Sequence, residues 1–339
     1  MIRELVYDLR QFFANKAVVL MYHRIAEPTS DVWEIAVSPK NFEDHLKVIK
    51  QMGNVVSLEE LTHRIKRKTL QRNTIGVSFD DGYPDNKEIA LPLLEKYKVP
   101  ATFFIASGNI DAPREFWWDE LEQIILFNEQ LPRNIVMQIG ETRVETNLGD
   151  EMILSATNRR KHINWKACTE TPPTGRAIFF YRVWELLKPM PPHIQQAHLQ
   201  QLRTLAKTEA LSRPGYRTMS TQELKEFAAS ALVTIGAHTV HHPALAFHST
   251  AFQEKEIVPN RKQLQEITGK GVDLISYPYG NFSDETIRIV SDAGFSAAFR
   301  TEEETAQNSS NRYKLGRYQV KNLTGQQLAS QIKLWKAKK

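Results

Sequence analysis

Short β-rich runs alternate with amphipathic, helix-like stretches along most of the chain, and this alternation constrains the fold more than any other feature. The predicted strands are residues 17–23, 74–80, 101–106, 232–237, 273–277, 295–299 and 315–320. The predicted helices are Pro39–Met52, 86–97, Thr250–Thr268 and 283–293. Because strands that alternate with helices build parallel βα units, the pattern predicts an α/β fold with an open parallel sheet or a barrel.

The stretch from about residue 110 to 220 breaks this rhythm. It holds a predicted hairpin, 135–139 with 143–146, and two proline-rich breaks, 171–175 and 189–192, that bracket a helical segment. The βα rhythm resumes with a predicted helix start at Ser220 and Thr221. A length of 339 residues fits about two domains or one barrel-sized domain with insertions. We interpret the stretch as a largely helical insertion above one face of the core.

The composition excludes several classes of protein. The single cysteine, Cys168, cannot form an internal disulfide, so a disulfide-stapled scaffold is ruled out. The formal net charge is 44 − 39 = +5, and the sequence lacks a basic platform interleaved with aromatic residues, so we predict no nucleic-acid partner. No uncharged apolar run is long enough to cross a bilayer, and charged side chains interrupt the first ten residues. We therefore expect a cytoplasmic protein of enzyme size.

The first chemical motif is the pair Asp80 and Asp81, which ends the predicted strand 74–80 and precedes Gly82. In βα barrels the carboxyl ends of the strands carry the active site. Adjacent side chains on an extended strand point in opposite directions, so both carboxylates reach one site only if the strand ends there, and Gly82 permits that break. The alternative is a structural Asp-Asp-Gly turn.

The second motif is His-Thr-Val-His-His-Pro at 238–243, directly after the predicted strand 232–237. The imidazoles of His238 and His242, four positions apart, match a frequent spacing of metal ligands. Pro243 disfavours a continuing helix, so the ligands are expected on a loop at the strand end. His241 is expected to point elsewhere. The alternative, a structural role, suits a single histidine better than three in five positions.

Two further strand ends carry polar groups. Residues 276–280 read Ser-Tyr-Pro-Tyr-Gly, a turn with aromatic side chains, and the first predicted strand ends in Tyr-His at 22–23. Each would be an ordinary turn if it stood alone. Polar groups at four strand ends of one βα series favour a shared site, because the carboxyl ends of parallel strands meet at one edge.

The order of these motifs resembles the polysaccharide deacetylases of carbohydrate esterase family 4. The resemblance covers roughly residues 15–110 and 220–322. The core of that family is a chitooligosaccharide deacetylase-type homology domain, so the resemblance implies an incomplete or distorted (β/α) barrel of about seven parallel strands. Residues 1–339 would then form a single domain of this type, with the insertion at about 110–220 between barrel strands.

Carried over residue by residue, the resemblance makes Asp81, His238 and His242 the metal ligands and Asp80 the catalytic base. The ligand set favours Zn²⁺, with Co²⁺ and Ni²⁺ as alternatives. Such an ion would lower the pKa of a water molecule and polarise the acetyl carbonyl, and Asp80 would take the proton of the water.

Three aromatic residues are the predicted substrate-binding residues. Tyr279 matches the turn that lines the substrate groove, and the backbone N–H of Tyr83, just after Asp-Asp-Gly, is expected to hold the oxyanion. Trp118 opens the insertion beside Trp117, and an indole face stacks well on a sugar ring. The alternative is that both tryptophans anchor the helix of the insertion in its core.

The sequence departs from the family pattern at two positions. Many members have an arginine before the third motif that orients the base, but Ser276 stands there, and Arg24 and Arg317 are the alternatives for its role. Many members also have a late histidine that acts as general acid, and the comparable strand at 314–318 has none. A subgroup carries an early Tyr-His motif instead, which makes His23 the candidate acid.

The resemblance implies hydrolysis of the N-acetyl group of an amino sugar, with release of acetate and a free amine. The expected cytoplasmic location predicts an intracellular precursor of a surface polysaccharide: a nucleotide-linked or lipid-linked N-acetyl sugar, or an oligosaccharide. The segment 323–339 places three apolar residues near one helical face beside several lysines, so it contacts either a membrane surface or the barrel, and we favour the barrel. Two rival functions stay open: an amidohydrolase for a non-sugar C–N bond, and a non-catalytic carbohydrate-binding protein with a degenerate site.

Overall fold

The computed structural model describes residues 15–112, 114–210 and 213–337. The chain forms two compact units. Unit 1 holds the described residues of Met1–Glu27, Ile35–Ile110 and Met219–Lys339, and unit 2 holds those of Pro28–Glu34 and Asp111–Thr218. The insertion predicted at about 110–220 coincides with the larger segment of unit 2. That the whole chain is a single domain stays a prediction.

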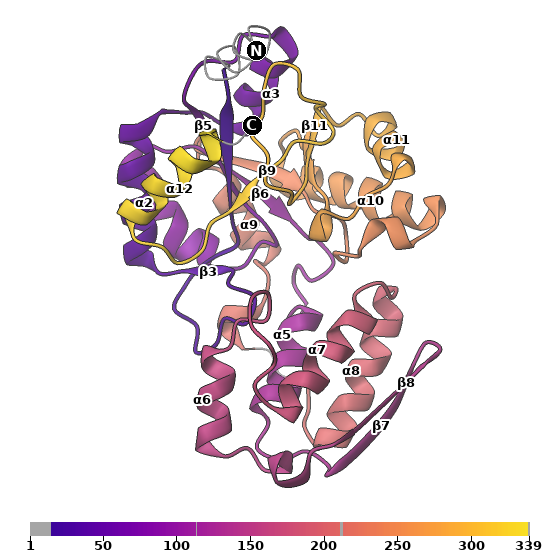
Figure 1. Ribbon diagram of the computed structural model, residues 1–339. Helices are drawn as coiled ribbons and strands as arrows, with labels where there is room; N and C mark the ends of the chain where they lie inside the picture. Colours follow the sequence, from indigo (N-terminus) through magenta and orange to yellow (C-terminus); the bar gives the residue numbers. More distant parts are fainter. Residues whose placement is uncertain (1–14, 113, 211–212, 338–339) are drawn as a thin grey trace, which may run out of the picture. The chain divides into compact units, whose positions relative to one another are not determined.

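Unit 1 is built on a parallel sheet with the strand order β11-β10-β9-β6-β5-β1-β12, and β4 pairs beside β5 (Figure 1). The strands are β1 Ala17–Tyr22, β4 Asn54–Val55, β5 Thr74–Phe79, β6 Ala101–Ile105, β9 Val233–Ala237, β10 Leu274–Ser276, β11 Ala297–Phe299 and β12 Tyr318–Gln319. A separate parallel pair joins β2 Arg24–Ile25 to β3 Ala36–Val37. Each of the seven predicted strands is present, and several are shorter than predicted.

The sheet curls into an incomplete barrel. Every residue of β1 and β5 is buried, as expected for central strands of a parallel sheet that is covered on both faces. The edge strands β11 and β12 do not pair with each other; a single bridge from Phe299 to Leu315 spans the gap. The incomplete (β/α) barrel of about seven parallel strands is therefore confirmed.

Helices cover the outside of this sheet. They are α2 Pro39–Met52, α3 Leu58–Arg67, α4 Leu91–Tyr97, α9 Thr221–Ala228, α10 Thr250–Thr268, α11 Asp284–Asp292 and α12 Gly325–Ala337. Ser220 and Ser283 cap α9 and α11 with capping boxes, which confirms both predicted helix starts. In Figure 1, α12 lies beside α2, and its buried residues Leu328, Ile332 and Trp335 belong to the core. The apolar face of α12 thus packs on the barrel.

Unit 2 is mainly helical. It contains α5 Trp117–Glu122, α6 Ala156–Asn164, α7 Gly175–Leu187 and α8 Pro192–Ala206, with the antiparallel hairpin β7 Asn134–Ile139 and β8 Thr142–Asn147. The predicted hairpin is confirmed, with its turn at Gly140 and Glu141. Thr174, in the first proline-rich break, caps α7, and Pro192, in the second, begins α8.

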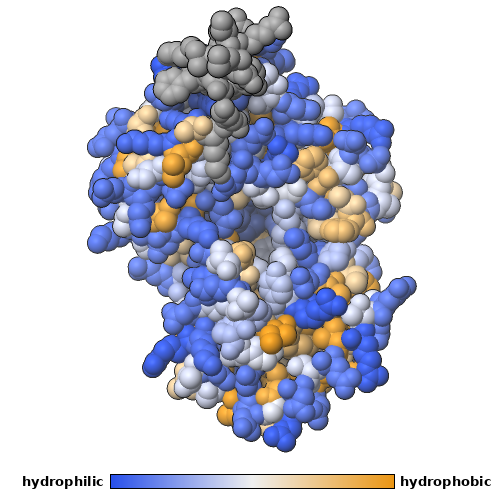
Figure 2. All heavy atoms as spheres, in the orientation of Figure 1, coloured by the Kyte–Doolittle hydropathy of each residue, from blue (hydrophilic) through white to orange (hydrophobic). Residues whose placement is uncertain are grey.

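Among the described residues, no helix combines the length and the apolar character needed to span a bilayer. On the face drawn in Figure 2, hydrophilic residues predominate and apolar residues lie singly or in small groups. Single exposed side chains such as Ile178 and Phe247 are normal for a protein surface.

Candidate metal centre and active site

The two polar motifs of the sequence meet at the carboxyl edge of the sheet. Asp80 and Asp81 follow β5, and His238 and His242 follow β9, with only β6 between these strands. Asp81 Oδ1 lies 3.5 Å from His238 Nε2 and 3.4 Å from His242 Nε2. All three side chains are buried, and their ligand atoms lie within 4.8 Å of one another. The predicted ligand set therefore converges on one point.

The donor atoms of this cluster suit a divalent cation. Two ligand atoms about 2.1 Å from one ion at a tetrahedral angle lie about 3.4 Å apart, close to the measured separations from Asp81 Oδ1. That oxygen is buried and accepts no hydrogen bond from the described residues. His238 Nδ1 lies 2.8 Å from the backbone oxygen of Ser276, so it donates there and leaves Nε2 as a basic nitrogen. These residues therefore fit a metal ion.

The backbone at this edge is strained. Asp81 (φ 74°), Thr239 (φ 65°), His242 (φ 57°) and Tyr279 (φ 57°) all have left-handed conformations, which non-glycine residues rarely adopt. Gly82 has φ 90°, and a Cβ atom there would lie 3.0 Å from Ile105 Cδ1. Such strain clusters at functional sites because the surrounding structure must hold it in place.

Asp80 is paired with Arg317, an arginine whose hydrogen-bond donors are all used. The Arg317 guanidinium makes a bidentate ion pair with Asp80, in which Nη1 lies 2.6 Å from Oδ1 and Nη2 lies 2.7 Å from Oδ2. Its other N–H groups donate to Ser276 Oγ, Ser78 Oγ and the backbone oxygen of Arg300. Arg317 is fully buried, and all five of its donors are used.

The ion pair of Arg317 with Asp80 offers a replacement for the motif arginine, whose absence is the first departure from the family pattern. Ser276 stands where the motif arginine is expected, and Arg317, one residue before β12, brings its guanidinium to the same carboxylate. The other alternative, Arg24, pairs with Asp85 at 3.0 Å and lies over the Tyr83 ring. The only sequence signal for Arg317 was its position within the predicted strand 315–320.

The electrostatics keep the carboxylates ionised. Burial opposes ionisation of Asp80, but the charge of Arg317, and then those of His238 and His23, outweigh it and hold the pKa of Asp80 well below its usual range. Burial likewise opposes ionisation of Asp81, and the nearby imidazoles of His238, His242 and His23 lower its pKa. Burial, reinforced by the charge of His238, lowers the pKa of His242 to about 3. A neutral His242 is the form that binds a metal.

The candidate acid His23 follows β1, the other neighbour of β5. Its imidazole is close enough to influence the pKa of Asp80, Asp81 and His242. Its Nδ1 is buried and has no hydrogen-bond partner among the described residues. The backbone oxygen of His23 accepts a bond of 2.8 Å from Asn86 Nδ2, which fixes the loop. His23 thus lies near the cluster, and its Nδ1 has no hydrogen-bond partner among the described residues.

The three predicted substrate-binding residues lie in different surroundings. The Tyr279 ring packs edge-on against His242, with ring centroids 4.5 Å apart, so it borders the cluster. Tyr83 is fully buried beneath Arg24. Trp118 belongs to unit 2, where it is buried and stacks on Phe116 at 4.5 Å. Their roles in substrate binding stay predictions.

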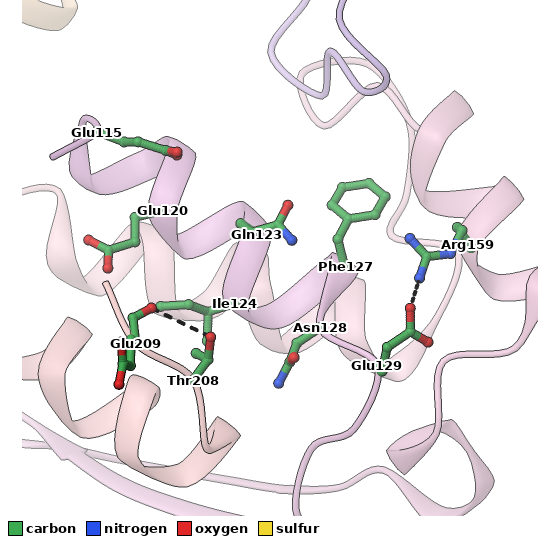
Figure 3. A pocket seen from close by; sticks show the side chains of 10 residues that line it. All are labelled: Glu115, Glu120, Gln123, Ile124, Phe127, Asn128, Glu129, Arg159, Thr208 and Glu209. Atoms are coloured by element: carbon green, nitrogen blue, oxygen red, sulfur yellow. Dashed lines mark hydrogen bonds and ion pairs between the residues drawn. The ribbon is translucent and has the colours of Figure 1, made fainter. Parts of the chain in front are cut away.

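A cavity of about 280 Å³ in unit 2 offers a different chemistry (Figure 3). The carboxylates of Glu120 and Glu129 line it but are paired with Arg203 and Arg159. Its described lining contains no histidine or cysteine. The described lining of the cavity therefore lacks the imidazoles that the cluster at the sheet edge provides.

The sequence of this chain matches known proteins in the segments that carry the cluster. The sequence model of the polysaccharide deacetylase family matches residues 67–128 and 199–298. The poly-β-1,6-N-acetyl-D-glucosamine N-deacetylase of Staphylococcus aureus (strain MSSA476) is 28% identical over 109 residues. That alignment covers 28% of this chain and 38% of the relative, so the chain spans well under half of the relative's length.

Solved structures share the fold. The deacetylase PplD of Streptococcus pyogenes, in complex with acetate, superposes with a TM-score of 0.57 at 16% identity, over 94% of this chain and 98% of that one. IcaB from Ammonifex degensii superposes with a TM-score of 0.57 at 18% identity, over 96% and 98% of the two chains. The motif order and the family match together identify residues 67–128 and 199–298 as polysaccharide deacetylase sequence, and the shared fold agrees with this match.

Proposed function

We propose that this chain is a metal-dependent deacetylase that hydrolyses the N-acetyl group of an amino sugar in a polysaccharide or its precursor. One observation carries the proposal: Asp81, His238 and His242 converge at 3.4 and 3.5 Å beside a carboxylate that a buried arginine keeps ionised. The relative from Staphylococcus aureus, named as an N-deacetylase of poly-β-1,6-N-acetyl-D-glucosamine, supports the substrate class.

The metal ligands in this proposal are Asp81 Oδ1, His238 Nε2 and His242 Nε2. A divalent cation, with Zn²⁺ as the first choice, would supply Lewis acidity that polarises the acetyl carbonyl and lowers the pKa of water. The protein keeps both histidines ready for this task, because Ser276 holds the tautomer of His238 and burial keeps His242 neutral.

Asp80 acts as the general base. Its ionised carboxylate accepts a proton from the water whose oxygen adds to the acetyl carbonyl carbon. Arg317 holds both carboxylate oxygens in one plane and orientation, which fixes the direction from which that water is deprotonated. The C–N bond then breaks, and acetate leaves with the added oxygen.

His23 acts as the general acid. The departing amine nitrogen needs a proton, and the imidazole of His23, which lies near Asp80 and Asp81, is the candidate donor. Tyr279, next to His242, would border the sugar ring that carries the acetyl group. The balance of the reaction is one water consumed and one acetate and one amine formed.

The two rivals differ in their support. A degenerate binding protein was suggested by the missing motif arginine and the missing late histidine, and the contact of Arg317 with Asp80 weakens the first of these reasons. An amidohydrolase for a non-sugar C–N bond would use the same groups on another substrate. The intracellular location and the carrier of the sugar stay predictions, which cell fractionation and assays with nucleotide-linked and lipid-linked sugars would test.

Acetate release from β-1,6-linked N-acetylglucosamine oligomers tests the proposal. We expect release by the wild type and by the control Asp292→Asn, a change at an exposed aspartate, but none by Asp80→Asn. No release from any N-acetyl sugar, with turnover of other amides, would favour the amidohydrolase. Tight binding of the oligomers without any turnover would favour the non-catalytic protein.

A further inference from the structure

The loop that carries both histidines is fastened to helix α10 as well as to β10 and to the segment after β6. We infer that Glu256 and Asn260 are positioning residues that hold the two histidine ligands in place for the metal. This inference rests on the proposed function, because it assigns these residues a role at the metal site. We call Glu256 and Asn260, which lie one turn apart on α10, the helix clamp.

Asn260 replaces one rung of the sheet. The ladder between β6 and β9 ends at the pair Ile105 and Ala237, and the next rung of a parallel ladder would join the N–H of His238 to the oxygen of Ile105. The Asn260 side chain stands between them instead. Its Oδ1 accepts from His238 N at 3.0 Å, and its Nδ2 donates to the oxygen of Ile105 at 3.1 Å. Asn260 therefore keeps β9 paired with β6 through its side chain where the metal-binding loop begins.

Glu256 fastens the middle of the loop. Its carboxylate accepts from the backbone N–H of His241 at 2.7 Å and from His241 Nδ1 at 2.8 Å. Its backbone oxygen accepts from Val240 N at 3.0 Å. Pro259 lies inside α10 and lacks the N–H group that would bond to the backbone oxygen of Lys255.

The clamp residues are buried polar groups, and apart from the bond of Asn260 to Ile105 their side-chain bonds are directed at this loop. Asn260 is fully buried and the Glu256 side chain is 5% exposed. Burying an ionised carboxylate is costly unless hydrogen bonds compensate it, and the bonds that compensate Glu256 come from His241. The loop in turn needs restraint, because Thr239 and His242 have left-handed backbones. An apolar helix face would cover the sheet equally well but would leave the N–H groups of the loop unpaired.

The clamp predicts a loss of metal affinity that is larger than any loss of stability of the metal-free fold. Groups that orient metal ligands typically contribute about 10- to 100-fold to metal affinity. We expect Glu256→Ala and Asn260→Leu to weaken Co²⁺ binding by about 10- to 100-fold. Glu256→Gln retains an oxygen that accepts from His241 N, so it should restore part of the affinity lost in Glu256→Ala. Glu254→Gln, at an exposed position on the same helix, is the matched control.

The test measures Co²⁺ affinity by competition with a chelator and thermal unfolding of the metal-free chains by circular dichroism. Weaker Co²⁺ binding in Glu256→Ala and Asn260→Leu, with partial rescue by Glu256→Gln and folded metal-free chains, supports the clamp. Wild-type affinity in these variants overturns it while leaving the metal site intact. Unfolding of the metal-free variants, with no rescue by Glu256→Gln, assigns both residues to the fold alone and overturns it as well. A wild-type chain that binds no Co²⁺ removes the proposed metal site, and the clamp with it.

Discussion

Replacing Arg317 by methionine tests whether this arginine takes the role of the motif arginine. Methionine has a similar length but leaves the Asp80 carboxylate, which is 3% exposed, without its countercharge. Two charge-assisted hydrogen bonds at 2.6 and 2.7 Å are lost, and each contributes about 1.5–3 kcal/mol. Breaking a buried ion pair costs about 3–5 kcal/mol in total. We expect the free energy of unfolding of Arg317→Met to fall by about that amount.

A double-mutant cycle separates this ion pair from general packing. Asp80→Asn removes the stranded charge, so Arg317→Met should cost much less in an Asp80→Asn background than in the wild type. Urea unfolding of the four chains gives the coupling energy between the two residues, which we expect to exceed about 1 kcal/mol, within the range for contacting pairs. Additive effects, with coupling below about 0.5 kcal/mol, would refute the account of this pair.

The same variant bears on catalysis. A base displaced by about 1 Å can lose about 10²-fold in rate, so kcat of Arg317→Met should fall by about that factor or more while metal binding stays unchanged. Arg317→Ala with Ser276→Arg moves the guanidinium to the usual place in the family, next to space that the first change empties, and should recover part of kcat. Wild-type kcat in Arg317→Met would show that Asp80 needs no positioning.

Three further predictions concern single side chains. Asp80→Asn should abolish acetate release with the metal still bound, and Asp81→Asn should lose the metal; metal analysis that shows the reverse would mean that the two aspartates exchange roles. His23→Ala should lower kcat by about 10²-fold, and an unchanged kcat would exclude it as the acid. Burial lowers the pKa of His45 from 6.5 to about 4, so below pH 6.5 the unfolded chain binds a proton that the folded chain refuses. The contribution of His45 to stability should therefore fall by about 3 kcal/mol between pH 7 and 4, and urea unfolding of His45→Asn should lack this dependence.

The sequence was sufficient for the parts of the fold that repeat a local rule. The strands β1 and β5 consist of apolar and small residues because they are buried on both faces, and their predicted ends differ from the structure by one residue. The strands at the two edges of the sheet were harder to predict. Residues 315–320 form only the short β12, because Leu315 bridges to β11 across the gap in the barrel. Such a contact depends on how far the sheet curls, which no local pattern encodes.

The candidate site also has a part that the sequence could predict and a part that it could not. The ligands Asp81, His238 and His242 stand beside strand ends, so the parallel topology alone brings them together. The groups that hold the base and the ligands come from elsewhere in the chain. Arg317 lies 237 positions from the base Asp80, and Asn260 lies 22 positions from the ligand His238. A buried polar residue on a helix reads as an ordinary helix residue until its partner is known, so the sequence offered no signal for Asn260.

The proposed function requires a metal ion that is held by Asp81, His238 and His242 and is needed for deacetylation. The most direct measurement is acetate release from an N-acetylglucosamine oligomer by the chelator-treated protein as Zn²⁺ is added stepwise. We predict no release without metal, a linear rise to a plateau at about one ion per chain, and no rise in the variant with His238→Ala and His242→Ala. Release that persists in the metal-free protein, or that rises equally in the double variant, would contradict the account.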